Sequence, residues 1–540
     1  MKQDKNRSGI NPDVSSRRHF LKTSLAMGGA IGAAPLMLSN PAAASSQYGQ
    51  YHKVYADDAR FDSMLTGSNL RFPNQPGYIA VCSSAHEVYM AAREAVANHL
   101  RLTVRSGGHC YEGFVVNDQG VVVDLSNMDR VYRSGDYYVV EAGASLGHTY
   151  KTLFKEFGVI MPGGSCFGVG VGGHVCGGGF GIHSRQYGLS SDYLAGVELI
   201  SFDQWGGQAN YPRTYFKGQS ARADEIVWAH QGGGGGNFGI VTKYFFKDLP
   251  PVPAYLHLQE IALPWHLFDY DQFATLLRNF GEFWQTHNGP DSRFNPLHVS
   301  MAIPNSVGGS GEIRLSLYCS GDPALIDEFI DRLFTPAQLQ DAKKGLRTTN
   351  HMGLQEQENA PQRPVPPGSY FSMPWWYGTQ YGAGTLVGAR GKNKSAYMKK
   401  PFPEAQIQTL WNTLRHGDYL SPGGMLQLSS YGGQINALSQ TETAVSHRDS
   451  IMKLQYQTYW FEAAQDPYHI GWINGFYHAM YGDAGPVPDE VMDGCYVNYA
   501  DVDIPDWQHL YYKHNYVRLQ QVKRQLDPHN QLHHAQSIEV

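Results

Sequence analysis

The first half of the chain alternates between short apolar runs and segments of helical periodicity. Apolar residues at helical spacing predict helices at 84–99, with Ser84 as the N-cap, and at 146–157. Runs rich in β-branched residues and bounded by turn residues predict strands, which fall at 78–82, 102–104, 120–125, 137–143 and 197–202. Together with the segment 232–242, these elements predict an α+β unit that ends near Lys247.

A second unit follows the proline-rich segment 250–253, which is a plausible domain boundary. Strands are predicted at 297–303 and 313–319, where polarity alternates, and a helix at 325–334. Another predicted helix carries its apolar side chains on one face: Phe268, Phe273, Leu276, Leu277, Phe280 and Phe283. Helices and antiparallel strands in separate runs predict a second α+β fold.

A segment rich in proline and aromatic residues, 361–384, lies within this second unit. Its aromatic side chains are Tyr370, Phe371, Trp375, Trp376, Tyr377 and Tyr381. Such a loop could stack on sugar rings or aromatic substrates. It could equally be a packed irregular loop, and the sequence leaves both interpretations open.

Length and composition set limits on this picture. A chain of 540 residues is too long for one compact core, so two or three structural units are expected. Aromatic residues make up 13% of the chain, which is enough for a sizeable core and an aromatic-lined pocket. The net charge is -6 and the basic residues are scattered, so nothing favours a nucleic-acid partner.

The first 44 residues have the pattern of a bacterial twin-arginine signal peptide. Arg17 and Arg18 precede a mildly apolar run at 25–38, and small residues at 41–44 follow. The alternative is a membrane anchor, but this run is too short to span ~30 Å of hydrocarbon. We therefore expect a periplasmic or secreted protein that engages the twin-arginine export machinery and has no stable membrane anchor. Disulfide pairing of its cysteines stays open.

Two glycine-rich loops carry the candidate chemistry. The first is Arg105-Ser106-Gly107-Gly108-His109, and the second extends over residues 161–189 and contains Cys166. Glycine permits backbone amides to crowd around a large anionic ligand. A loop with a histidine and a loop with a cysteine therefore predict a large phosphate-bearing cofactor. Backbone amides would bind it, and the histidine and cysteine side chains would attach it to the protein.

A metal site is the competing interpretation. Its ligands would come from His109, Cys110, Cys166, His174, Cys176 and His183. However, no pair among them shows the usual C-x₂-C or H-x₃-H spacing, and a metal site does not need so many glycines. We expect no metal.

The order of five motifs resembles the berberine-bridge-enzyme-like branch of the vanillyl-alcohol-oxidase flavoprotein superfamily, with its PCMH-type FAD-binding domain. The motifs are residues 105–109, 166–174, 177–179 and 232–242, and a C-terminal motif made of 515–519 and 527–530. The resemblance implies an α+β fold with an FAD domain at 74–250, completed by a berberine-bridge-enzyme-like segment at 491–540. A substrate domain with an antiparallel sheet, 251–490, would be inserted between them.

The resemblance also implies bicovalent FAD. His109 would bond the flavin 8α-methyl group and Cys166 the flavin C6 atom; imidazole and thiolate are nucleophiles suited to this addition. The alternatives are a polar turn residue for His109 and a small buried hydrophobe for Cys166. The remaining residues expected to bind the cofactor are Arg105, Ser106, Gly107, Gly108, Val169, Gly172, Gly173, His174, Gly178, Gly179, Gly239, Ile240, Val241 and Asn515.

Two positions near Cys166 refine the implied chemistry. In the family that the chain resembles, a small residue three positions after the cysteine accompanies oxygen access to the flavin, so Val169 favours an oxidase over a dehydrogenase. Phe180 departs from some plant members, which carry tyrosine there, so no role of that hydroxyl is transferred.

Tyr499 matches the tyrosine base of alcohol-oxidising members. A tyrosine with an ordinary pKa near 10 needs help to act as a base at neutral pH. Lys453 and Gln455 resemble pocket residues that could give this help, and Tyr431 is a second candidate tyrosine. Each of them could instead be a packed strand residue with its polar end satisfied.

These observations predict an exported FAD-linked oxidase. It would oxidise a hydroxyl of a sugar, an oligosaccharide or a secondary metabolite, with oxygen as acceptor and hydrogen peroxide as product. Two alternatives stay open: oxidative C–C or C–N bond formation on a secondary metabolite, and a secreted flavin-containing protein that binds a partner with little turnover.

Overall fold

The computed structural model describes residues 51–308, 311–334, 370–379 and 388–540. The signal peptide predicted at 1–44 lies outside these residues, as do Tyr381 and much of the aromatic segment. None of the helices in the described ranges combines the length and the apolar character that crossing a membrane requires.

The first half of the described chain contains a small sheet with the order β1-β2-β4-β3. Strands β2, β4 and β3 are parallel, and β1 pairs with β2 in the antiparallel sense. The bounds are β1 His52–Val54, β2 Tyr78–Val81, β3 Leu102–Arg105 and β4 Val121–Asp124. The three parallel strands were predicted from the sequence, and the structure confirms them.

A second, antiparallel sheet of this half has the order β5-β6-β9-β7-β8. Its bounds are β5 Val131–Ser134, β6 Tyr137–Glu141, β7 Leu194–Ile200, β8 Arg213–Phe216 and β9 Ile240–Phe246. The predicted strands at 137–143 and 197–202 correspond to β6 and β7, whereas β5, β8 and β9 were not predicted as strands.

Helices beside these sheets confirm the helical periodicity. Helix α3 (Ala85–Ala97) begins where Ser84 Oγ accepts a hydrogen bond from the Glu87 amide at 3.2 Å, so Ser84 is the N-cap. Helix α4 (Leu146–Thr152) continues as a π-helical turn over Leu153–Phe157 and covers the predicted helix. Helices α2 (Phe61–Leu65), α6 (Ser184–Tyr187) and α7 (Ala221–Ala229) were not predicted.

Part of the second glycine loop is a short helix, α5 (Val171–Cys176), where the sequence indicated only a loop. Val171, Val175 and Cys176 are buried on one side of it. A side chain at Gly172 would lie 2.8 Å from the carbonyl oxygen of Ala142, so glycine is required for the helix to pack against the end of β6.

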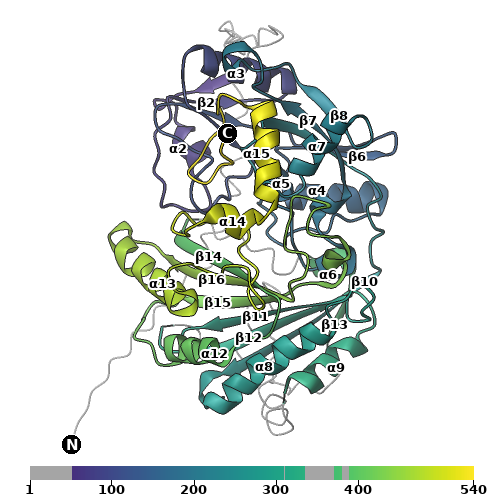
Figure 1. Ribbon diagram of the computed structural model, residues 1–540, viewed down its shortest axis with the longest axis vertical. Coiled ribbons are helices and arrows are strands. Elements are labelled where there is room, and N and C mark those ends of the chain that lie inside the picture. Colours follow the sequence, from purple (N-terminus) through teal and green to yellow (C-terminus); the bar gives the residue numbers. More distant parts are fainter. Residues whose placement is uncertain (1–50, 309–310, 335–369, 380–387) are drawn as a thin grey trace, which may run out of the picture. The chain divides into compact units, whose positions relative to one another are not determined.

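The second half is organised by an antiparallel sheet of seven strands with the order β13-β10-β12-β11-β15-β16-β14. Figure 1 shows helices α8, α9 and α12 along one face of it. The strand bounds are β10 Tyr255–Pro264, β11 Leu297–Pro304, β12 Glu312–Cys319, β13 Phe371–Pro374, β14 Arg390–Met398, β15 Met425–Ser430 and β16 Met452–Trp460. The helices are α8 Tyr270–Thr286, α9 Ala324–Leu333, α11 Trp375–Thr379, α12 Glu404–Leu410 and α13 Asp466–Tyr481.

The two faces of this sheet differ in polarity. In β12 the side chains of Ile313, Leu315 and Leu317 are buried, while the alternating positions carry Glu312, Arg314, Ser316 and Tyr318 and stay partly exposed. Helix α8 supplies apolar side chains to the core, and all six apolar residues predicted for its face are buried. Phe268 lies just before the helix, which begins after the capping box of Asp269 and Gln272.

The C-terminal residues return to the first half of the chain. Helix α15 (Asn515–Leu526) ends where the Leu526 carbonyl accepts a hydrogen bond from the Phe202 amide at 2.7 Å. The buried Lys523 ammonium donates to the carbonyl oxygens of Asn237 at 2.8 Å and Leu532 at 2.7 Å. The C-terminal segment therefore packs against the unit formed by residues far earlier in the sequence. Helix α14 (Trp507–Tyr512) precedes it.

In the described part of the aromatic segment, Trp375 is buried and Trp376 packs against protein, whereas Phe371 and Tyr377 are exposed. The buried Trp375 indole donates through Nε1 to His183 Nε2 at 2.8 Å, and the Trp376 ring stacks on Phe154 with 5.3 Å between ring centroids. His183 must be neutral to accept this bond, and burial lowers its pKa to about 4.

We predict that this buried histidine makes the fold sensitive to acid. An unfolded histidine has a pKa near 6.5, so between about pH 6.5 and 4 the unfolded chain binds more protons than the folded one, and stability falls as the pH falls. The loss at His183 is on the order of 3 kcal/mol by pH 4. The variant His183→Gln, whose amide oxygen can accept from Trp375, should lose less of its thermal midpoint than wild type between pH 7 and 4.5. The exposed His148→Gln should match wild type, and equal losses in all three proteins would contradict the prediction.

Candidate active site

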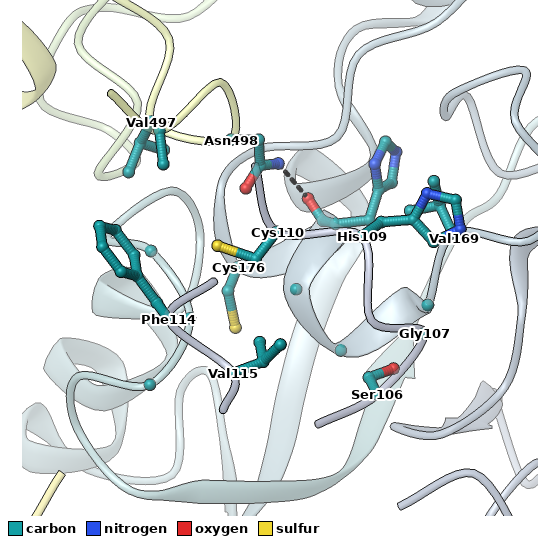
Figure 2. A pocket seen from close by; sticks show the side chains of 18 of the residues that line it. Ser106, Gly107, His109, Cys110, Phe114, Val115, Val169, Cys176, Val497 and Asn498 are labelled. Atoms are coloured by element: carbon teal, nitrogen blue, oxygen red, sulfur yellow. Dashed lines mark hydrogen bonds between the residues drawn. The ribbon is translucent and has the colours of Figure 1, made fainter. Parts of the chain in front are cut away.

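A cavity of about 390 Å³ lies where three parts of the chain meet (Figure 2). The first half contributes residues 106–111, much of the second glycine loop, and residues 234–241. The seven-stranded sheet contributes His298, Gln427, Ser429 and Lys453, and the C-terminal part contributes residues 496–500. In the view of Figure 2, Phe114 and Val497 lie to the left and His109 and Val169 to the right.

Two glycines bring the two predicted loops into direct backbone contact. A Cβ atom at Gly107 would lie 2.3 Å from the Gly170 amide nitrogen and 2.8 Å from the Gly168 carbonyl oxygen. A Cβ atom at Gly170 would lie 2.1 Å from Ser106 Oγ. Such distances are impossible for real side chains, so glycine at both positions allows the loops to cross. The sequence suggested that these glycines make room for a ligand; the structure shows that they also make room for each other.

The crossing places His109 and Cys166 on the wall of one cavity. Burial and the nearby Arg105 cation lower the pKa of His109, so its imidazole is neutral and has a nitrogen lone pair at neutral pH. Burial raises the pKa of the Cys166 thiol. All six cysteines are free thiols in this structure.

His174 supports the cysteine loop. Its Nε2 atom accepts a hydrogen bond from the Gly164 amide at 3.0 Å, and burial lowers its pKa to about 4, which keeps that nitrogen unprotonated. The His174 carbonyl in turn accepts from Asn498 Nδ2 at 3.0 Å, the interaction dashed in Figure 2. Among the described residues, no three His, Cys, Asp or Glu side chains converge as metal ligands.

The cavity suits an anionic cofactor. Its described lining contains many glycines but neither aspartate nor glutamate. Positive φ angles at Gly234 and Gly236 turn the backbone of the five-glycine segment, as glycine permits. A wall of backbone amides without carboxylates accommodates a pyrophosphate, so these residues fit FAD.

Lys453, which is buried, and Tyr499, which is partly buried, form a pair that also lines the cavity. Lys453 Nζ donates to Tyr499 Oη at 2.8 Å and lies over three aromatic rings, those of Phe180 at 4.5 Å, Tyr496 at 4.7 Å and Tyr499 at 4.0 Å from the centroids. Burial raises the pKa of Tyr499 well above its ordinary value and lowers the pKa of Lys453, so desolvation favours phenol and amine. The aromatic faces act in the opposite sense, because they attract an ammonium cation.

The sheet side of the cavity is polar and extends into a second cavity of about 290 Å³. The two cavities share Ser165, Ile182, His298 and Gln427. Gln427 Nε2 donates to Ser300 Oγ at 2.9 Å, and Gln427 Oε1 accepts from Gln457 Nε2 at 2.9 Å. These hydrogen-bonding groups lie on three neighbouring strands, β11, β15 and β16.

Comparisons with known proteins agree with this arrangement. A family model described as an FAD binding domain matches residues 76–203, and one described as berberine and berberine-like matches residues 495–539. The aclacinomycin-N/aclacinomycin-A oxidase of Streptomyces galilaeus is 34% identical to the chain, with 97% of this chain and 98% of that protein covered. This chain belongs to the berberine-like family of FAD-linked oxidases.

Other members of the berberine-like family show the same relationship. The hexose oxidase of Chondrus crispus is 33% identical, with 89% of this chain and 93% of that protein covered. A solved structure of a glycopeptide hexose oxidase complexed with teicoplanin has a TM-score of 0.80 and 32% identity, with 91% and 99% of the two chains covered. The chain is thus an FAD-linked oxidase with the α+β fold of this family.

Most of the residues expected from the family resemblance line the cavity. Besides His109, Cys166, Lys453 and Tyr499, these are Ser106, Gly107, Gly108, Val169, Gly172, Gly173, His174, Gly239, Ile240 and Val241. Six expected residues do not line it, namely Arg105, Gly178, Gly179, Tyr431, Gln455 and Asn515.

The side chains among these six contact other parts of the protein. The Arg105 guanidinium donates to the carbonyl oxygens of Leu65 and Thr66, both at 2.7 Å. Asn515 Nδ2 donates to the Gln440 carbonyl at 2.7 Å.

Tyr431 and Gln455 do not line the cavity, but each contacts one residue that does. The buried Tyr431 hydroxyl donates to the His447 carbonyl at 3.2 Å, while its ring stacks on Phe180. Gln455 Nε2 donates to Asn393 Oδ1 at 2.9 Å and to Tyr111 Oη at 3.3 Å. Phe180 and Tyr111 both line the cavity.

Several residues that line the cavity were not predicted from the sequence. They include Tyr111, His298, Gln427, Ser429 and Asn498. Tyr111 and Asn498 are close in sequence to His109 and Tyr499, and that proximity was the available signal. Gln427 and Ser429 alternate with apolar residues in β15, so a search for period-two polar positions could have found them.

We predict that Gly107→Ala separates the two loops. Its methyl group would contact backbone atoms that cannot move independently, which should cost about 1–3 kcal/mol of unfolding free energy. Flavin incorporation should also fall, measured as the FAD-to-protein absorbance ratio together with the thermal midpoint. The control is Gly289→Ala, because a Cβ atom at Gly289 meets nothing within 4 Å. Full flavin content and unchanged stability in Gly107→Ala would show that the loops do not need this crossing.

Proposed function

We propose that this oxidase carries FAD bonded to both His109 and Cys166 and oxidises a hydroxyl group of a sugar or a secondary metabolite. The observation that carries this proposal is the position of the Lys453–Tyr499 pair, which lines the same cavity as His109 and Cys166. A candidate base and two candidate tethers thus share one enclosure. When bound there, FAD supplies a hydride acceptor and, through oxygen, the route to hydrogen peroxide.

Tyr499 would remove the proton of the substrate hydroxyl. The pair can exist as phenol plus amine or as phenolate plus ammonium, and moving the proton between them leaves the net charge of the cavity unchanged. The hydrogen bond from Lys453 strengthens as negative charge grows on Tyr499 Oη, and the three aromatic faces stabilise the charge on Nζ. Lys453 therefore makes the phenolate form accessible despite burial.

The polar sheet surface supports a substrate with several hydroxyl groups. Gln427, Ser429 and His298 line the main cavity, and the second cavity provides space beyond them. One of the two relatives above is named for aclacinomycin and the other for hexose, which is a sugar. A sugar hydroxyl, free or within a larger glycosylated molecule, fits this surface better than a uniformly apolar substrate would.

The proposed signal peptide and domains have the boundaries expected from the sequence. Residues 1–44 would direct twin-arginine export, 74–250 and 491–540 would form the FAD domain, and 251–490 the substrate domain. Val169, a small residue on the cavity wall, would leave access for oxygen.

Bicovalent attachment can be tested by acid precipitation followed by visible spectroscopy. Wild-type protein should keep its yellow colour in the pellet, and so should His109→Ala and Cys166→Ala, since one tether remains in each. The double variant should release FAD into the supernatant. Cys110→Ala, which removes another cavity-lining thiol, should behave as wild type. Release of flavin from wild type would overturn both tethers.

Alcohol oxidation can be tested by hydrogen peroxide release with a panel of sugars, glycosides and aromatic alcohols. Tyr499→Phe should retain flavin but lower kcat by about 10²–10⁴-fold, the usual contribution of a general base. In Lys453→Met the acid limb of the kcat/KM profile should move to higher pH, because the phenolate loses its hydrogen-bond donor. Lys400→Met, at an exposed lysine, serves as control. A protein that binds flavin but releases no peroxide with any alcohol would contradict the proposed reaction.

A further inference from the structure

A cluster of charged side chains, most of them buried, lies outside the lining of the cavity, next in sequence to the lining residues Tyr111 and Ala500. Lys392, in β14, has a fully buried side chain, and its Nζ atom lies 2.5 Å from Glu112 Oε1, 2.6 Å from Asp501 Oδ1 and 3.0 Å from Asp503 Oδ2. Lys394, two residues further along the strand, lies 2.7 Å from Asp501 Oδ2.

A third cation approaches the cluster from another direction. Arg71 Nη1 lies 3.9 Å from Glu112 Oε2 and donates to the Gly391 carbonyl at 3.1 Å. The three cations Arg71, Lys392 and Lys394 thus balance the three carboxylates of Glu112, Asp501 and Asp503. A buried lysine is costly unless it is paired, and here every carboxylate that surrounds it comes from another part of the chain.

The sequence positions of these carboxylates connect the cluster to the candidate chemistry. Glu112 lies three residues after His109, and Asp501 lies two residues after Tyr499. Tyr111 and Tyr499 are also neighbours across this junction, with ring centroids 5.6 Å apart. One ammonium group therefore links the loop that bears the candidate tether to the segment that bears the candidate base.

We propose that Lys392 is a positioning residue, which fixes the loop of His109 and the segment of Tyr499 relative to each other through Glu112 and Asp501. This inference rests on the proposed function only for the roles of His109 and Tyr499. Lys392 itself lines neither cavity and touches no reacting group. Its effect is geometric, because displacement of a base or a bound cofactor by about 1 Å can cost on the order of 10² in rate.

The pKa shifts favour an ionised Lys392, while they make Glu112 easier to protonate than an ordinary glutamate. Burial lowers the pKa of Lys392, but the Asp501 and Glu112 carboxylates outweigh this and leave that pKa raised. Burial raises the pKa of Glu112 against the opposing influence of Lys392. Removing Glu112 leaves Lys392 with Asp501 and Asp503, so it cuts the connection to His109 without leaving the lysine unpaired.

The test compares Glu112→Ala and Glu112→Gln with wild type, with Glu328→Ala as the matched control. Glu328 pairs with Arg293 at the surface and lies in helix α9. Hydrogen exchange of the purified holoenzyme should accelerate at least about threefold in peptides from 107–115 and also from 499–503 in Glu112→Ala. Peptides from helix α8 should not change. Glu112→Gln, which keeps a neutral hydrogen bond, should show a smaller effect in the same two segments and carries the test if the alanine variant folds poorly.

Kinetics provide a readout that a loss of stability alone would not give. With a substrate that wild type turns over, Glu112→Ala should lower kcat by about tenfold while KM stays within about twofold, and Glu112→Gln should fall between. Exchange that rises only in 107–115, or a kcat equal to wild type, overturns the positioning role. If wild type shows no alcohol turnover, the proposed function fails, while the exchange pattern still decides whether the bridge couples the two segments.

Discussion

The close approach of two backbones at Gly107 and Gly170 is the constraint on which the site depends. No side chain larger than hydrogen fits at either position, because each Cβ would lie inside the contact distance of the other loop. The contact places a loop that follows a parallel strand directly against a loop that precedes a short helix. His109 and Cys166 face one cavity for this reason, although they are separated in sequence and belong to different elements.

The seven-stranded sheet provides part of the cavity wall, because one of its faces packs in the core and the other faces the cavity. Leu317 of β12 and Leu426 and Leu428 of β15 join the core, while Arg314 and Ser316 of β12 and Gln427 and Ser429 of β15 line the cavities. The same alternation that stabilises the fold therefore provides hydrogen-bonding groups for a substrate. Gln427 shows the connection, since it holds Ser300 and Gln457 on neighbouring strands and also lines both cavities.

Three buried lysines, Lys523, Lys392 and Lys453, differ in the groups that stabilise their side chains. Lys523 binds backbone carbonyls and Asp527, and so fastens the C-terminal segment to the first half of the chain. Lys392 is surrounded by carboxylates from distant segments. Lys453 has aromatic faces and a phenol instead of a carboxylate, which leaves its proton able to move. The difference in partners agrees with a structural role for Lys392 and Lys523 and with the role proposed for Lys453 beside Tyr499.

The sequence by itself determined the elements whose pattern is local and the residues that belong to ordered motifs. The helix capped by Ser84 and the apolar face of α8 were predictable, since periodicity does not depend on distant partners. Motif order likewise identified His109 and Cys166 as candidates, and the structure places both on the wall of one cavity. Strand β14 was not, because its buried Lys392 and Lys394 interrupt the apolar pattern. Their carboxylate partners Glu112 and Asp501 lie 280 and 107 residues away in sequence. Only the tertiary structure could show that Gly107 meets Gly170, that Lys453 contacts Tyr499, and that Arg105 and Asn515 bind backbone outside the cavity. These contacts join segments with no local signal for each other, so folding alone decides them.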